Sequence, residues 1–263
     1  SAATTGHVLL ETRAANGDVI VNANVTSGSG HLSLVAADDL DLNANLATTG
    51  GSVYLAAANG TVDGAGTDGI VMAVGTTTAS GGGNILLTAT GESDLVLGLV
   101  NAGAGHVSLA AQRDILDGGE AGLNVQANTL RMVADAAGGT ANAGQIGRAD
   151  LLNGDATANA NAIATQVTTL AARSADGIYV LESDGLTVDA LAAFNVTQVH
   201  FNSTATPVAA AAQEDLATTD AGPVKLVSTT GSITVNAGTA ATAGVSAATT
   251  GHVLLETRAA NGD

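Results

Sequence analysis

Short runs of alternating apolar and polar residues recur along the chain. In the clearest run, residues 40–46, four apolar residues alternate with Asp41, Asn43 and Asn45. A period of two places successive side chains on opposite faces of a β-strand. The runs are about five residues long and end at clusters of Gly, Asn, Asp or Thr, which form turns. The pattern therefore predicts many short strands joined by tight turns.

One strand template begins with Gly and continues with alternating apolar residues. It occurs at residues 6–12, 30–36, 51–57, 83–89, 105–111 and 222–228, and the first five starting glycines are 24, 21, 32 and 22 residues apart. Strand patterns repeated at roughly this spacing are typical of a β-solenoid, in which each strand pairs with its counterpart one coil away. We expect an all-β parallel solenoid. An antiparallel sandwich is the alternative, but it needs hairpins between neighbouring strands rather than a coil-length repeat.

The segment SAATTGHVLLETRAANGD occurs twice, at residues 1–18 and 246–263, with identity at 18 of 18 positions. We interpret residues 1–245 as one complete tandem unit and residues 246–263 as the start of the next identical copy. About 11 coils of roughly 22 residues each would advance a fibre by roughly 50 Å per unit. The two copies are expected to be equivalent rungs, one unit apart.

Two stretches depart from the strand templates. Residues 135–160 are rich in Ala, Gly and Asn, so we expect loops or a coil with a protruding insertion. Residues 206–220 contain four consecutive alanines, followed by Gln213, Glu214, Asp215 and Leu216. This composition predicts one short helical turn outside the coil.

Composition favours a narrow, repetitive core. The chain has 34 Gly and 46% apolar residues, but only 2% aromatic residues and no Trp or Cys. Disulfides therefore contribute no stability. The net charge of −17 disfavours nucleic acid and anionic membranes as partners, and no apolar run approaches the ~20 residues of a membrane span. No basic-then-apolar leader occurs at the N-terminus. The acidity favours solubility and repulsion between fibres; bridging by a divalent cation such as calcium is the alternative.

Candidate metal ligands are sparse. His7, His31, His106 and His252 each follow a Gly at the start of the template, but Ser52 and Asn84 hold that place in intervening coils. Because a metal site needs three or four convergent ligands, we interpret the histidines as polar residues flanking turns. Residues 64–69 match GxGxxG, yet no helix pattern follows. They also resemble one piece of a calcium-binding nonapeptide, which needs several stacked pieces. A wide turn is the preferred interpretation.

Candidate catalytic residues are equally sparse. Carboxylates cluster at Asp38, Asp39 and Asp41 and again at Asp114, Asp117 and Glu120. Paired carboxylates can hydrolyse glycosides, and β-helices host polysaccharide-degrading enzymes. However, a sugar groove normally stacks sugars on aromatic rings, and the chain has only Tyr54, Tyr179, Phe194 and Phe201. It also lacks the basic cluster that would stabilise a lyase intermediate. We assign no catalytic, cofactor or metal residue and expect no enzyme activity.

The coil template resembles the repeats of filamentous haemagglutinin-like giant bacterial exoproteins and adhesins. So do residues 145–147, 169–172, 175–180 and 182–188; the likeness covers most of the chain and is weakest at 135–160. It implies a right-handed parallel β-helix, secretion to the cell surface, and a role in adhesion, aggregation or toxin-presenting stalks, without shared catalytic residues. We therefore expect a structural, non-catalytic unit of an extracellular fibre. Adjacent copies would be its end-to-end partners, and other fibres, cell surfaces or glycans are further candidates. A calcium-dependent binding module and a polysaccharide-acting enzyme are the alternatives.

Overall fold

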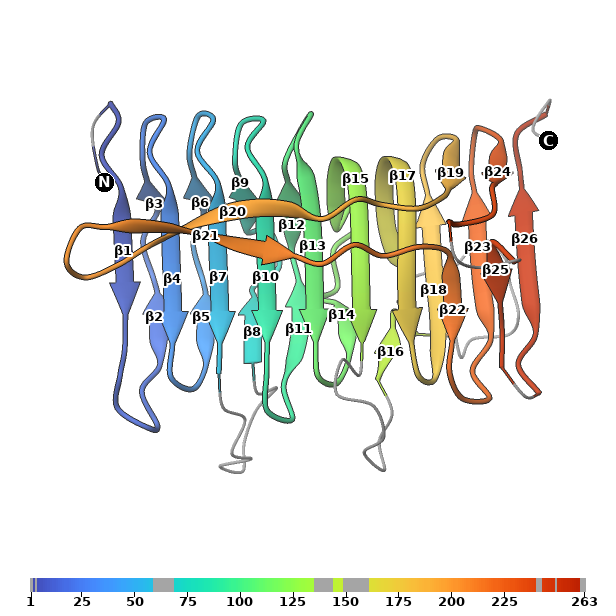
Figure 1. Ribbon diagram of the computed structural model, residues 1–263, viewed down its shortest axis with the longest axis horizontal. Coiled ribbons are helices and arrows are strands. Elements are labelled where there is room, and N and C mark those ends of the chain that lie inside the picture. Colours follow the sequence, from blue (N-terminus) through green and yellow to red (C-terminus); the bar gives the residue numbers. More distant parts are fainter. Residues whose placement is uncertain are drawn as a thin grey trace.

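The protein is a right-handed parallel β-helix whose axis lies horizontally in Figure 1. The computed structural model describes residues 2, 4–58, 69–134, 144–148, 161–239, 243–248 and 250–260. Every regular element in these ranges is a strand; 24 strands form one large sheet and two form an antiparallel hairpin. Pairing in the large sheet is parallel, coil upon coil. The predicted solenoid is confirmed, and the sandwich alternative is wrong.

Face A carries the Gly-initiated template in the first five coils and lies toward the viewer in Figure 1. Its strands stack in the order β1 (Val8–Glu11), β4 (Leu32–Ala36), β7 (Val53–Ala57), β10 (Ile85–Ala89), β13 (His106–Ala111), the second halves of β15 (Val125–Ala134) and β17 (Ile163–Ser174), β19 (Leu186–Val188) with β22 (Leu216–Thr218), and β24 (Ile233–Val235) with β25 (Val245–Ser246).

Two shorter faces close each early coil. Face B stacks β2 (Val19–Val21), β5 (Leu40–Leu42), β8 (Gly69–Met72), β11 (Asp94–Leu97), β14 (Ile115–Asp117), β16 (Gln145–Ile146), β18 (Gly177–Glu182), β23 (Val224–Ser228) and β26 (Val253–Thr257). Face C stacks β3 (Val25–Thr26), β6 (Leu46–Ala47), β9 (Thr77–Ala79), β12 (Leu99–Asn101) and the first halves of β15 and β17. From β18 onward, one straight strand serves faces B and C together, because the second half of β18 pairs with the first half of β17.

The core is a set of stacked aliphatic columns. Leu32, Val53, Ile85 and Val107 follow one another on face A, and all four side chains are fully buried. The predicted alternation in residues 40–46 is confirmed, since Leu40, Leu42 and Leu46 are buried and Asn43 and Asn45 are exposed. Ladder hydrogen bonds and this narrow core hold the coils together without aromatic filling.

The template glycines form a column at the corner that leads into face A. A Cβ atom on Gly30, Gly51, Gly83 or Gly105 would lie 2.0–2.3 Å from the carbonyl oxygen of the template glycine one coil before it. Contacts under 3.0 Å essentially never occur for real Cβ atoms. Glycine is therefore required here because neighbouring backbones approach too closely for any side chain.

The described residues make nine rungs on face A and nine on face B, fewer than the predicted eleven. The count is lower because segments such as 189–215 leave the coil. Val253 lies eight rungs beyond Val19, an advance of about 40 Å, which is less than the roughly 50 Å expected for residues 1–245. Most of the predicted 135–160 insertion lies outside the described residues; residues 144–148 within it contribute β16.

The segment 189–215 interrupts face A between β19 and β22 and contains a hairpin rather than a helix. Strands β20 (Phe194–Val199) and β21 (Ala205–Ala210) pair antiparallel, with Phe194 opposite Ala210. The helical turn predicted within 206–220 is therefore wrong. The alanines have helical propensity, but pairing with the β-branched residues of β20 overrides that weak preference.

The two identical 18-residue segments both form parallel strands, but on different faces. Val8 stacks against Leu32 on face A, whereas its counterpart Val253 stacks against Val224 on face B. The expectation of equivalent rungs is not met in this structure. Val224–Ser228 nevertheless pairs in register with Val253–Thr257, so the sequence that opens the unit also fits onto the coil that ends it.

Candidate functional site: a hairpin strap across face A

The hairpin strap, defined as residues 191–213, is the feature that departs most from a plain coil. A two-way backbone bridge closes its base: Leu191 N donates to Gln213 O at 2.7 Å, and Gln213 N donates to Leu191 O at 3.1 Å. From there β20 runs back toward the first coils and β21 returns antiparallel to it, across the outer side of face A and over β4, β7 and β10 (Figure 1). The strap therefore joins the last coils to the first ones.

Polar side chains of face A hold the edge of β20. The N–H of Val199 donates to Ser33 Oγ and that of Thr197 to Ser52 Oγ, both at 2.8 Å, while Asn84 Nδ2 donates to Asn195 O at 3.1 Å. Hydrogen bonds of this kind are worth about 1 kcal/mol each, and more when one partner would be left buried and unpaired. These side chains satisfy the strand edge that β20 would otherwise expose.

Apolar contacts beneath the strap form a second small core. Leu86, Val196 and Ala210 are buried there, and three partly buried side chains pack against them: Tyr54, Phe194 and Val208. Burial raises the pKa of Tyr54. Two of the chain's few aromatic residues are thus used to fasten the strap rather than to form a sugar-binding platform.

The tip of the strap presents an exposed aromatic ring. Phe201 is 72% exposed, and the guanidinium of Arg13 lies 4.4 Å from the centre of its ring, a cation–π distance. Arg13 Nη2 also donates to Glu11 Oε2 at 2.8 Å, which lowers the pKa of Glu11. Ser203, with a φ of 64°, lies in the turn between the strands. The tip therefore sits beside the first coil.

The polar residues that follow the template glycines contact one another from coil to coil on face A. His7 Nδ1 accepts the N–H of His31 at 2.9 Å, and the two rings stack with centroids 4.9 Å apart. His31 Nδ1 accepts the N–H of Ser52, also at 2.9 Å. Burial, and then the neighbouring His7, lower the pKa of His31. The Nδ1 atom of each ring therefore accepts a backbone N–H of the next coil, which favours a structural role for the pair.

Later members of this column support the strap. Asn84 Oδ1 accepts the N–H of His106 at 3.1 Å, and the His106 ring lies 5.4 Å from that of Phe194. His252 lies outside this column, because it precedes β26 on face B rather than a strand of face A. Asn84 and His106 therefore flank turns and also contact the strap, a second role that the sequence did not indicate.

The two carboxylate clusters identified in the sequence lie on different coils, and their oxygens accept hydrogen bonds from backbone N–H groups. Asp39 Oδ1 accepts the N–H of Gly69 at 2.7 Å, and Asp114 Oδ1 accepts that of Gln145 at 2.8 Å. Asp117 Oδ1 accepts from Gly119 and Glu120 within its own turn. Asp38 is buried, whereas Asp41 lies partly exposed on β5, with a pKa raised by desolvation. Of the GxGxxG segment, only Gly69 is described; it opens β8.

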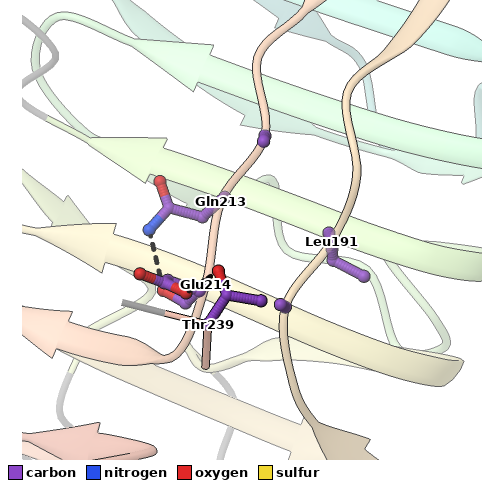
Figure 2. Close-up of a pocket in the computed structure, with 6 residues that line it drawn as sticks. Leu191, Gln213, Glu214 and Thr239 are labelled. Atoms are coloured by element: carbon purple, nitrogen blue, oxygen red, sulfur yellow. Dashed lines mark hydrogen bonds between the residues drawn. The ribbon is translucent and has the colours of Figure 1, made fainter. Parts of the chain in front are cut away.

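A pocket of about 300 Å³ lies at the base of the strap (Figure 2). Gln213 Nε2 donates to Glu214 O at 3.0 Å, and Thr239 Oγ1 donates to Glu214 Oε2 at 3.1 Å. A second pocket of about 290 Å³, lined by His106 and Phe194 among others, shares Ala190 and Leu191 with the first. Gln213, Glu214 and Thr239 therefore hold the chain at the point where the strap leaves the coil. These hydrogen bonds do not pair an acid with a base across the pocket.

Glu182 is a buried carboxyl group that sequence analysis missed. Its side chain has no exposed surface and points into the coil in the column of Thr165 and Ser228. Oε2 accepts from Thr165 Oγ1 at 2.7 Å, while Oε1 accepts from the N–H groups of Ser183 and Asp184 at 3.1 and 3.3 Å. Burial raises the pKa of Glu182 to about 8, and the neighbouring Asp184 adds to the rise. The carboxyl group is therefore neutral in the folded protein near neutral pH.

Within the described ranges, no group of three or more His, Asp or Glu side chains is arranged to hold a metal ion. Nor does that part of the chain contain a helix of the length and apolarity needed to span a membrane. The contacts between the strap and face A fasten a β-hairpin onto the stacked coils.

The chain matches no protein-family model, no curated protein and no solved structure.

Proposed function

We propose that this chain is a structural, non-catalytic repeat unit of a secreted or cell-surface fibre, in which it acts as a stiff spacer. The observation that carries the proposal is the pairing of Val224–Ser228 with Val253–Thr257. The second segment repeats residues 8–12, so the last coil of one unit accepts the first strand of another copy with its ladder hydrogen bonds intact. Stacked units of this kind stabilise one another through nearest-neighbour contacts.

The resemblance of the coil template to adhesin repeats supports the extracellular part of the proposal.

Chains with one, two and three tandem copies of the 245-residue unit test the fibre role. Electron microscopy should show unbranched rods of constant width that lengthen by about 40 Å per added copy, because the unit advances by eight rungs. Compact particles, or lengths that do not scale with copy number, would contradict the proposal. A large fall in melting temperature on adding a chelator would favour the calcium-dependent alternative, and turnover of a polysaccharide would favour the enzyme.

A further inference from the structure

In this structure the strap lies on face A, the face that contains residues 8–11. Those residues form β1, and the strap is seated on Ser33 and Ser52 of the next two rungs of face A. Its tip reaches the first coil, where Phe201 stacks on Arg13. The position of residues 8–11 therefore fixes the side of the coil on which the strap lies.

The counterpart of this segment in the following copy lies on another face. Val253–Thr257 pairs with β23 and continues the column formed by Ile115, Ile146 and Ile178, which is face B. A copy that continues from residue 246 therefore places its own face A above face B of this copy. Its strap would then lie over the outer side of β26, away from the strap of the preceding copy.

The outer side of β26 has the groups that this strap would need. Arg258 and Glu256 correspond to Arg13 and Glu11, and the ion pair is repeated: Arg258 Nε lies 3.0 Å from Glu256 Oε1. Leu254 is 45% exposed, whereas its counterpart Leu9 is partly buried.

We propose that the outer side of β26, around Leu254 and Arg258, is the docking surface for the strap of the following copy, so that straps of successive copies lie on different sides of the fibre. The inference rests on the proposed fibre function. Phe201 of the following copy would stack on Arg258, as Phe201 stacks on Arg13 within this unit. A plain translation from copy to copy would instead align all straps on one side.

Engineered disulfides in this cysteine-free chain test the rotation first. Leu254 is opposite Lys225 when β26 occupies face B. If residues 253–257 stacked on face A above Val235, residue 254 would instead be opposite Asn236. Neighbouring strands are about 4.8 Å apart, within the range that a disulfide bridges. The pair Lys225→Cys/Leu254→Cys should oxidise readily, and Asn236→Cys/Leu254→Cys should not; the reverse result would overturn the proposal.

Thiol labelling of a single Leu254→Cys substitution in the first copy of a two-copy chain tests the docking itself. Labelling should be at least about tenfold slower than in the one-copy chain, and replacing residues 193–211 of the second copy by a short Gly-Ser linker should restore most of the rate. Slow labelling that persists without the second strap would show that the added coil alone covers Leu254, which overturns the docking surface. The labelling rate and the rod length test different proposals. If rods lengthen by about 40 Å per copy but Leu254→Cys is labelled as fast in the two-copy chain as in the one-copy chain, the fibre proposal stands and the docking proposal is rejected.

Discussion

The Gly51→Ala variant is expected to lose most of its folding stability or to fail to fold. A Cβ atom at this position would lie 2.0 Å from the carbonyl oxygen of Gly30 and 2.5 Å from its carbonyl carbon. Both atoms belong to backbone that is fixed by the ladder between face A strands, so no flexible side chain can move aside. We expect a loss of at least about 3 kcal/mol, at the upper end of single substitutions. Urea denaturation followed by circular dichroism measures it.

The control for this variant is Gly122→Ala. No atom lies within 4 Å of a Cβ atom built on Gly122, and its backbone is not in the left-handed region. The substitution should change stability by no more than about 0.5 kcal/mol. Similar stabilities for the Gly51 and Gly122 variants would show that the coils are not in contact at the glycine column.

Stability is expected to fall as pH rises from about 4.5 to about 8 because of Glu182. The ordinary pKa of 4.5 is raised to about 8 by burial in the folded state. Below pH 4.5 the group is neutral in both states; between the two pKa values the folded state keeps a proton that the unfolded state releases. The free energy of unfolding therefore decreases across this window and levels off above it, by at most about 5 kcal/mol.

The Glu182→Gln variant should remove this part of the pH dependence. Its amide oxygen can accept the N–H groups of Ser183 and Asp184, and its NH₂ group can donate to the Thr165 hydroxyl. We expect the variant to be more stable than the parent at pH 9 and similar at pH 4. Glu92→Gln, on an exposed side chain, is the matched control and should follow the parent. A Glu182→Gln profile parallel to the parent profile would contradict the assignment of a neutral carboxyl group.

The coil architecture could be predicted because its determinants are local. Alternation fixes which side chains point inward, and the template glycines mark the same corner in successive coils. Residues 178–182 even contained the signal for the buried carboxyl group, because Ile178, Val180 and Glu182 share one phase of the alternation and are all buried. The pattern alone does not predict a buried carboxyl group, because an inward carboxyl group normally has a charged partner.

The strap could not be placed from the sequence because its contacts span most of the chain. Val199 and Ser33 are 166 residues apart, and no short-range pattern links them. A local signal for the hairpin did exist: residues 194–197 alternate, and Asn202 and Ser203 follow as turn formers. The alanines of 209–212 obscured it by favouring a helix. The number of coils was overestimated for the same reason, since residues assigned to coils belong to the strap.

Distances between spin labels along face B test the stacked coil most directly. Ile20, Leu116 and Lys225 occupy outward positions on the first, fifth and eighth rungs of that face. At about 4.8 Å per rung, the Cα atoms of residues 20 and 116 should lie about 19 Å apart, and those of residues 20 and 225 about 34 Å apart. Double electron–electron resonance on cysteine pairs measures both. A separation of 20 and 225 no greater than that of 20 and 116 would contradict a parallel stack of coils.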